Sequence, residues 1–259
     1  MNQRRKNSGR DTLPAVFLGF MMPGLGQIYN GELVKGVSFF VLILVTMFVG
    51  LRGSLLLPDS LLIYGALCTM IACAALYVGA IVEAFNTASR SDASYLLKPY
   101  NRWYFYLAMW FLGSAISGIG QGYVRDHYIE AYKIPASSME PTVRRGDCVL
   151  ADKTAYDRIA PRKGDIVIFL FPDDRSKKFI KRIEGLPGDT ITSPDGTVEK
   201  VPHGFVYVLG DNRGNSYDSR KFGFVPLRDI IAKARQIYYS SGAQGIVWGR
   251  IGVVINSGQ

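Results

Sequence analysis

The sequence predicts an N-terminal α-helical transmembrane region followed by a mostly-β domain. Three long apolar runs occupy the first half of the chain, at residues 34–51, 61–82 and 103–124. From about residue 128 on, short β-rich runs alternate with turn sequences such as LPGD and SPDG. The composition agrees with this division, because 48% of the residues are apolar while 20% are charged. Such a mixture indicates an apolar part and a polar part within one chain.

The first part of the chain, residues 1–31, joins a basic N-terminus, MNQRRKNSGR, to an apolar stretch at 13–31. Pro14, Pro23 and several glycines interrupt this stretch, so we do not expect it to cross a membrane as one helix. We expect an interfacial or re-entrant helical hairpin instead. A cleaved signal peptide is disfavoured, because further apolar runs follow at once.

The three long runs are expected to span the membrane within a region that covers residues 32–127. The run at 34–51 is about as long as a bilayer is thick at the rise of an α-helix. The run at 103–124 starts with an aromatic cluster that is typical of a membrane interface. Length and apolarity together disfavour the alternative, which is a set of buried helices in a soluble core.

The loop between the second and third runs sets the topology. It carries Arg90, Lys98 and Arg102, and basic loops stay in the cytoplasm. The basic N-terminus belongs on the same side, so two crossings lie between them. The third crossing then leaves residues 128–259 on the extracytoplasmic side of a multi-pass protein of the cell membrane.

The charge distribution and the few cysteines and histidines argue against a nucleic-acid-binding protein, a disulfide-rich protein and a metalloprotein, although the net charge is +9. The basic residues are scattered without a dense stripe, which favours a positive-inside membrane protein and no nucleic-acid partner. Cys68, Cys73 and Cys148 do not form a disulfide framework. His127 and His203 are isolated from each other and from the cysteines, so no metal site is expected.

The pattern of residues 128–259 predicts a mostly-β domain. Its β-rich runs are separated by turn residues, which fits neither a helical bundle nor a series of βαβ units. The runs are DCVLADK, DIVIFLF, KFIKRIEG, DTITS, FVYVLG and ARQIYYS.

A serine nucleophile is a candidate in AYKIPASSMEPT, residues 131–142, where Ser137 and Ser138 adjoin. A serine needs a neighbouring base to take its proton. The two histidines have no patterned acidic partner, so a lysine with a lowered pKa is the alternative. In KKFIKRIEGLPGD, a strand would place Lys181 on one face with Phe179, and Ile180 with Arg182 on the other. Periodicity alone favours a solvated basic strand here over a buried base.

A polar loop in YVLGDNRGNSYDSRKFGFVP, residues 207–226, is the third candidate region. Asp218 can pair with Arg220 or Arg213, and Ser216 could offer its hydroxyl to a neutral lysine. An ordinary surface turn is the alternative.

These stretches together resemble type I signal peptidase, a family of membrane-bound serine proteases that trim exported preproteins. The resemblance rests on IPASSMEPTVRRGDCVLADK, KGDIVIF, FIKRIEGLPGD and GDNRGNSYDSRKFGFVP, which follow the family's order and cover most of residues 130–226. The ending VWGRIGVVI is also similar to the family's closing segment.

The resemblance implies a catalytic domain with a signal-peptidase-like β fold. It implies an endopeptidase that removes N-terminal signal peptides after small residues at positions −3 and −1, without a metal or cofactor. The implied partners are preprotein signal peptides and the lipid bilayer, with the secretion translocon as a further candidate.

The resemblance also assigns roles to residues of this sequence. Ser138 matches the nucleophile, Lys181 the general base, and Ser216 the serine that orients the lysine. Three residues match structural ion pairs near the site: Arg182, Asp218 and Arg220. Five match the shallow substrate pockets: Ile134, Pro135, Met139, Phe179 and Ile180.

Two features depart from the family pattern. Ala136 stands where some members have a serine that completes the oxyanion hole, and losing one such donor costs roughly 3 kcal/mol in other enzymes. The stretch PGLGQIYNGELVKG resembles a small membrane module of unrelated proteins.

Two rival functions follow from the same residues. One is a Ser/Lys autoprotease of the SOS-repressor type, which the membrane runs disfavour, as does the lack of a basic recognition helix. The other is a non-catalytic membrane assembly or sensor protein, which would require a broken dyad. Hydrogen-bond distance between Ser138 Oγ and Lys181 Nζ is the test that separates them.

Overall fold

The computed structural model describes residues 10–91, 97–157, 159–192, 196–242 and 244–255. The chain packs as two units. The first comprises Met1–Ser54 and Tyr64–Tyr123, and the second comprises Leu55–Ile63 and Val124–Gln259. Most of the predicted basic N-terminus, residues 1–9, lies outside the described residues.

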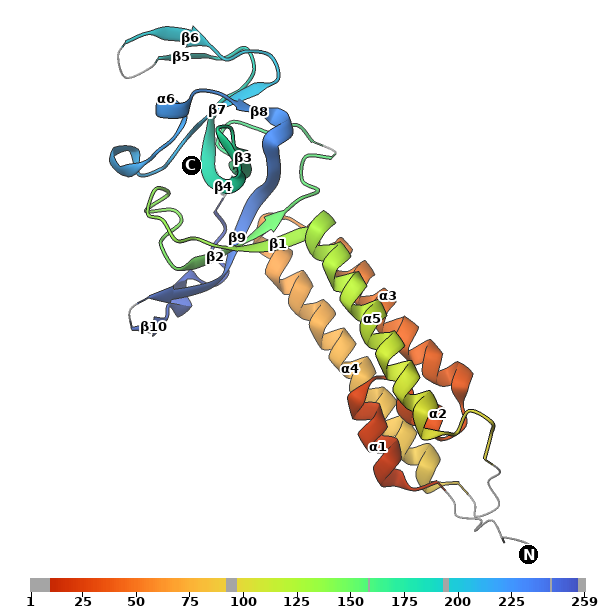
Figure 1. The fold of residues 1–259 in the computed structure, drawn as a ribbon. Coiled ribbons are helices and arrows are strands. Elements are labelled where there is room, and N and C mark those ends of the chain that lie inside the picture. The colour runs from red at the N-terminus through yellow and green to blue at the C-terminus, as the bar shows by residue number, and fades with distance from the viewer. Residues whose placement is uncertain (1–9, 92–96, 158, 193–195, 243, 256–259) are drawn as a thin grey trace, which may run out of the picture. The chain divides into compact units, whose positions relative to one another are not determined.

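The first unit is helical (Figure 1). Among its described helices, α3 and the continuous stretch Asp59–Ser89 are long and apolar enough to cross a membrane by length and composition. The third predicted span forms a helix of 25 residues, α5, but is not one of these two. The helices are α1 (Thr12–Met21), α2 (Leu25–Tyr29), α3 (Leu33–Leu55), α4 (Leu62–Ser89) and α5 (Trp103–His127).

The interrupted stretch at 13–31 folds as two helices, α1 and α2. Gly24 in the turn between them has a φ of 95°, which glycine adopts without a steric cost. A side chain there would overlap the backbone of Gly36 at the start of α3. Side-chain amides in α2 and at its C-cap bind α4, since Gln27 Nε2 donates to Ala80 O at 2.6 Å and Asn30 Nδ2 to Ala84 O at 2.8 Å. The depth of this hairpin in a membrane stays a prediction.

The second unit is built on an antiparallel sheet with the order β1-β2-β9-β3-β4-β7-β8, in which β10 also pairs with β9. A separate two-stranded sheet pairs β5 with β6. The strands are β1 (Ile129–Lys133), β2 (Asp147–Asp152), β3 (Ile166–Phe171), β4 (Asp174–Gly185), β5 (Thr190–Thr192), β6 (Val198–Lys200), β7 (Phe205–Leu209), β8 (Val225–Pro226), β9 (Ile230–Gly242) and β10 (Gly245–Ile246). A short helix, α6 (Ser219–Phe222), and 3₁₀ turns at Asp59–Leu61, Arg213–Asn215, Leu227–Asp229 and Trp248–Arg250 complete the described elements.

The central strand β3 explains where the core lies. Five of its six residues are buried, as expected for a strand covered on both faces. On β4, Phe179 and Ile183 pack into the core cluster that contains Val167 and Phe169. Because side chains alternate along a strand, Lys181 belongs to this same face and stands opposite Val167.

Residues 55–63, which run from the last residue of α3 to the first turn of α4, fold with the β unit. Arg235 on β9 is only 6% exposed, and its guanidinium donates to Leu55 O at 2.8 Å, Leu57 O at 2.6 Å and Asp59 Oδ1 at 2.5 Å. This segment was expected to belong to the membrane region, residues 32–127. Nothing in the local pattern signals a contact with a strand so much later in the chain.

Candidate active site

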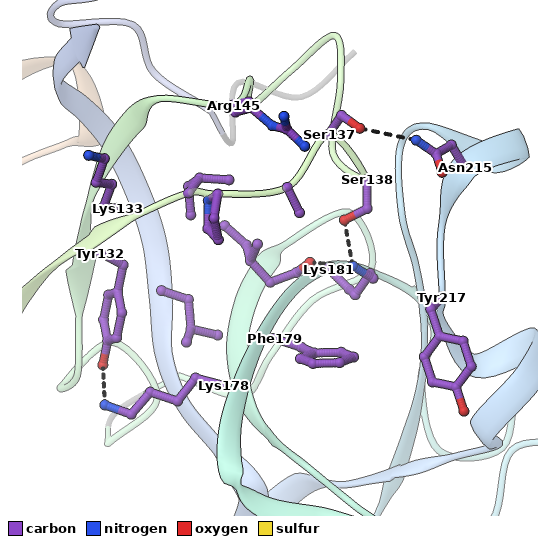
Figure 2. A pocket seen from close by; sticks show the side chains of 15 residues that line it. Tyr132, Lys133, Ser137, Ser138, Arg145, Lys178, Phe179, Lys181, Asn215 and Tyr217 are labelled. Carbon is purple, nitrogen blue, oxygen red and sulfur yellow. Dashed lines mark hydrogen bonds between the residues drawn. The ribbon is translucent and has the colours of Figure 1, made fainter.

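The predicted dyad is assembled. Lys181 Nζ donates to Ser138 Oγ at 2.8 Å and to Ile180 O at 3.0 Å (Figure 2). The two side chains come from different elements, since Ser138 follows β1 and Lys181 lies in β4. This distance is within reach for direct proton transfer. A non-catalytic relative with a broken dyad is therefore disfavoured.

The surroundings of Lys181 favour its neutral form. Only 4% of the residue is exposed, and Nζ lies 5.6 Å from the centre of the Phe179 ring. Desolvation lowers the pKa of Lys181 to about 8, although the nearby carboxylates of Asp218 and Asp211 oppose this shift. The interpretation of β4 as a solvated basic strand, which periodicity favours, is therefore wrong at Lys181.

The nucleophile segment is held by its own backbone and by the core. Ile134 N donates to Asp147 O at 2.8 Å and Gly146 N returns a bond to Ile134 O at 2.9 Å. The turn after Ser138 buries Met139 and Val143 completely. These apolar anchors fix the backbone on each side of the serine, so the hydroxyl is presented from a constrained turn.

A loop after β7 fastens the nucleophile segment from the other side. Asn212 N donates to Ser138 O at 3.1 Å, and Asn212 Nδ2 donates to Ser137 O at 3.2 Å. Asn215 Nδ2 donates to Ser137 Oγ at 3.1 Å, as Figure 2 shows. Both the carbonyl and the hydroxyl of Ser137 therefore accept hydrogen bonds from this loop.

Two Arg–Asp pairs shape that loop. Arg182 binds Asp211 through Nε at 2.8 Å and Nη2 at 2.7 Å, a bidentate geometry. Arg220 binds Asp218 in the same way, at 2.8 and 2.9 Å. Burial alone would raise the pKa of Asp218, but the hydrogen bonds from Arg220 and from Gly210 N outweigh it and hold the pKa low. Both carboxylates therefore stay ionised beside the neutral form of the lysine.

The sequence did not identify a partner for Arg182. For Asp218 it left two candidate partners, Arg220 and Arg213. Arg213 instead pairs with Glu184 at 2.8 Å.

Ser216 is buried in the site but its hydroxyl is not hydrogen-bonded to the lysine. The residue is 7% exposed, and its Oγ, which meets no partner in full hydrogen-bond geometry among the described residues, lies near the Asp218 carboxylate and helps to lower the pKa of that group. A side chain on Gly210 would overlap this hydroxyl and would come within 2.5 Å of Ser138 O. The lysine-orienting role of Ser216 therefore remains a prediction. Its hydroxyl lies in close packing with Gly210.

A cleft of about 640 Å³ opens beside the dyad. Of the five predicted pocket residues, Ile134, Pro135, Phe179 and Ile180 line it. Met139 differs from the prediction, because it is fully buried in the core cluster with Ile134 and is not among the described residues that line the cleft. Its long apolar side chain fills the interior of the turn instead. Further lining residues are Tyr132, Lys133, Ala136, Ser137, Ser138, Arg145, Ile168, Lys178, Lys181, Asn215 and Tyr217.

Sequence reasoning missed three residues of the site. Asp211, Asn212 and Asn215 all lie in the Gly-, Asn- and Asp-rich loop, which was expected to need internal hydrogen bonds. Their partners are Arg182 on β4 and the adjacent residues Ser137 and Ser138, so only the fold could identify them. Within the described part of the chain, no group of three or more His, Cys, Asp or Glu residues could hold a metal ion.

The family model described as signal peptidase, peptidase S26, matches residues 107–199 and 194–239, which include both members of the dyad. The chain belongs to this family. Its members named signal peptidase I are serine endopeptidases, in agreement with the Ser–Lys geometry described above.

Similar proteins include the signal peptidase I of Leptolyngbya laminosa, 37% identical over 141 residues, which are 43% of this chain and 69% of that one. The probable signal peptidase I-2 of a Synechocystis strain is 36% identical over 163 residues, 52% of this chain and 73% of that one. A crystal structure of a signal peptidase I from Enterococcus faecalis is 27% identical and covers 29% of this chain and 97% of that one, with a TM-score of 0.26.

Proposed function

We propose that this protein is a signal peptidase I, an endopeptidase that removes N-terminal signal peptides from exported preproteins. The observation that carries the proposal is the 2.8 Å hydrogen bond between Ser138 and a buried Lys181, in a chain that belongs to a family of serine endopeptidases.

The reaction is an acyl transfer in two steps. Neutral Lys181 Nζ takes the proton of the Ser138 hydroxyl as Oγ attacks the carbonyl carbon of the scissile peptide bond. The tetrahedral intermediate collapses when the ammonium of Lys181 returns a proton to the leaving amine, which is the new N-terminus of the mature protein. Lys181 then takes a proton from a water that attacks the ester carbonyl, and it returns this proton to Ser138 Oγ as the ester bond breaks, which frees the signal peptide as an acid and restores the free serine. No metal or cofactor takes part in this scheme.

The substrate residues before the cut are small. The cleft beside Ser138 is walled by Ile134, Pro135, Phe179 and Ile180, which supports shallow apolar pockets for side chains at positions −1 and −3. Alanine fits such pockets without displacing a wall residue. The backbone N–H of Ser138 is the expected donor to the oxyanion, and Ala136 adds no hydroxyl to it.

The protein acts as a multi-pass protein of the cell membrane, with its β unit on the extracytoplasmic side. Two apolar helices of sufficient length support a membrane location. The membership of residues 55–63 in the β unit supports one side for that loop and for the β unit, as the predicted topology requires. The lipid bilayer is thus a partner, and the secretion translocon is a candidate for a further one.

Cleavage of a preprotein by the full-length protein in detergent tests the proposal. Ser138→Ala and Lys181→Ala should each lower kcat by about 10⁴-fold or more, as in other serine proteases when one residue of the catalytic group is removed. Ser176→Ala and Lys177→Ala on the exposed part of β4 are matched controls that should keep full activity. Cleavage retained by either dyad variant would contradict the mechanism.

A further inference from the structure

The cleft beside the dyad is positively charged. Lys133, Arg145 and Lys178 line it in addition to Lys181, and no Asp or Glu is among its described lining residues. A cleft lined by charges of one sign concentrates a ligand of opposite charge. The charge therefore bears on which substrate segment the cleft accepts.

The three cations differ in whether the protein already neutralises them. Lys178 Nζ lies 3.6 Å from Glu130 Oε1 and donates to Tyr132 OH at 3.4 Å. Within the described ranges, no ion pair is formed by the side chains of Lys133 or Arg145. The Glu140 carboxylate accepts the backbone N–H of Arg145 at 3.4 Å, but it forms no ion pair with the guanidinium. Arg145 thus offers an uncompensated charge to the cleft.

The backbone places Arg145 close to the reacting bond. The reciprocal bonds between Ile134 and the pair Gly146–Asp147 set the chain of Arg145 beside Pro135 and Ala136, directly before the nucleophile. Figure 2 shows the guanidinium on the side of the cleft that carries Ser137 and Ser138. Lys133 stands five residues before Ser138, which is about 16 Å along an extended chain.

We propose that Arg145 is a specificity-determining residue that pairs with a carboxylate side chain of the substrate within two residues of the cleaved bond. The inference rests on the proposed function and adds the chemistry of the preferred substrate. A guanidinium matches a carboxylate bidentately, whereas a lysine at the same substrate position would meet repulsion from it. The preferred preproteins therefore carry Asp or Glu at position −2, +1 or +2, outside the small residues at −1 and −3.

A charge-reversal experiment tests this pairing. Preproteins that keep small residues at −1 and −3 and differ by Glu, Gln or Lys at −2, +1 or +2 are cleaved by the full-length protein in a neutral detergent. At the preferred position, kcat/KM should be about tenfold higher for Glu than for Gln, and lower again for Lys. Arg145→Glu should reverse this order, and Arg145→Lys should keep it. Raising the salt concentration should reduce the Glu preference.

Arg144→Glu is the matched control. Arg144 is exposed, precedes Arg145 directly and is not one of the described cleft-lining residues, so its variant should keep the wild-type order. The Glu-to-Lys ratio is independent of how much enzyme is folded, so partial misfolding does not obscure the result.

Three results would overturn the inference. They are equal cleavage of the three substrates at every position, an unchanged order in Arg145→Glu, and an equal effect of Arg144→Glu. In each of these, cleavage of the Gln substrate leaves the proposed function standing. If the wild-type protein cleaves no preprotein, the proposed function fails and this inference fails with it.

Discussion

At the scale of single residues, the environment of Lys181 decides what chemistry the site can perform. A solvated lysine is almost fully protonated at neutral pH and cannot accept the proton of a serine. The position of Lys181 on the core face of β4 removes its hydration, and the pKa falls to about 8. The fold thereby supplies a base without a histidine.

The pH dependence of cleavage should report this lysine. Because the neutral amine is the active form, kcat/KM on an uncharged substrate should rise with pH and reach half of its plateau near pH 8. The measurement is a rate profile from pH 6 to 10, with circular dichroism as a control for folding. A rate that stays constant from pH 7 to 9 would speak against Lys181 as the base.

Replacing Lys181 with Met should abolish cleavage but raise stability at neutral pH. The folded-state pKa of about 8 lies below the ordinary lysine pKa of 10.5, so the folded protein resists protonation of this group. Burying this lysine lowers the free energy of unfolding by on the order of 3 kcal/mol. The full loss applies below about pH 8, and it decreases as the pH rises toward 10.5. The gain in thermal midpoint for Lys181→Met should therefore be larger at pH 7 than at pH 10. A lower midpoint at pH 7 would show that the lysine's hydrogen bonds outweigh its desolvation.

Much of the site is readable from the sequence because it lies in short contiguous motifs. Ser138, Lys181, Asp218 and Arg220 were identified in this way, and the structure brings them together. The orientation of the Ser216 hydroxyl away from a hydrogen bond with Lys181 and the burial of Met139 were not predictable, because side-chain orientation in a tight turn depends on distant neighbours. Periodicity also failed at Lys181, since a charged residue on a core face contradicts the usual alternation.

At the scale of elements, the loop from Gly210 to Asp218 holds the nucleophile in place. It leaves β7, contacts both serines of the nucleophile segment through Asn212 and Asn215, and closes on itself through the pair of Asp218 and Arg220. Arg182 ties the start of the loop to β4, the strand that carries the lysine. One element therefore sets the distance between the two members of the dyad.

Gly210→Ala tests this role. A methyl group there would come within 2.5 Å of Ser138 O and overlap Ser216 Oγ, so the nucleophile segment must shift. A displacement of about 1 Å can cost roughly 100-fold in rate, and we expect a loss of that size in kcat with little change in KM. Gly214→Ala is the control in the same loop, since a methyl group at Gly214 meets nothing within 4 Å. Equal rates for the two variants would contradict the proposed role of the loop.

Most strands were predictable because alternation and turn residues are local signals. The six predicted β-rich runs correspond to β2, β3, β4, β5, β7 and β9. Their order in the sheet was not predictable, since β9 inserts between β2 and β3 from the far end of the domain. Strand pairing at that separation depends on tertiary packing, which local patterns do not report.

At the scale of the whole chain, the sequence anticipated an apolar helical part and a β part, and the structure has both. The boundary differs, because residues 55–63 belong to the β unit. Arg235 accounts for this: its buried guanidinium pairs with Asp152 at 3.2 Å as well as with Asp59 and two carbonyl groups of the loop. A buried arginine is stable only with such partners, and the loop supplies three of them.

The contacts of Arg235 with residues 55–59 predict the membrane side of that segment. Charge patterns alone predict a side only for the basic loops. Because residues 55–63 fold with the β unit, we expect both on the same side of the membrane, and the positive-inside rule predicts that this side is extracytoplasmic. In a variant without Cys68, Cys73 and Cys148, Ser60→Cys and Lys177→Cys should react with an impermeant maleimide in intact cells. Arg90→Cys should react only after the membrane is opened. Labelling of Ser60→Cys and Lys177→Cys from opposite sides would contradict the docked loop, and protection of both would contradict the orientation alone.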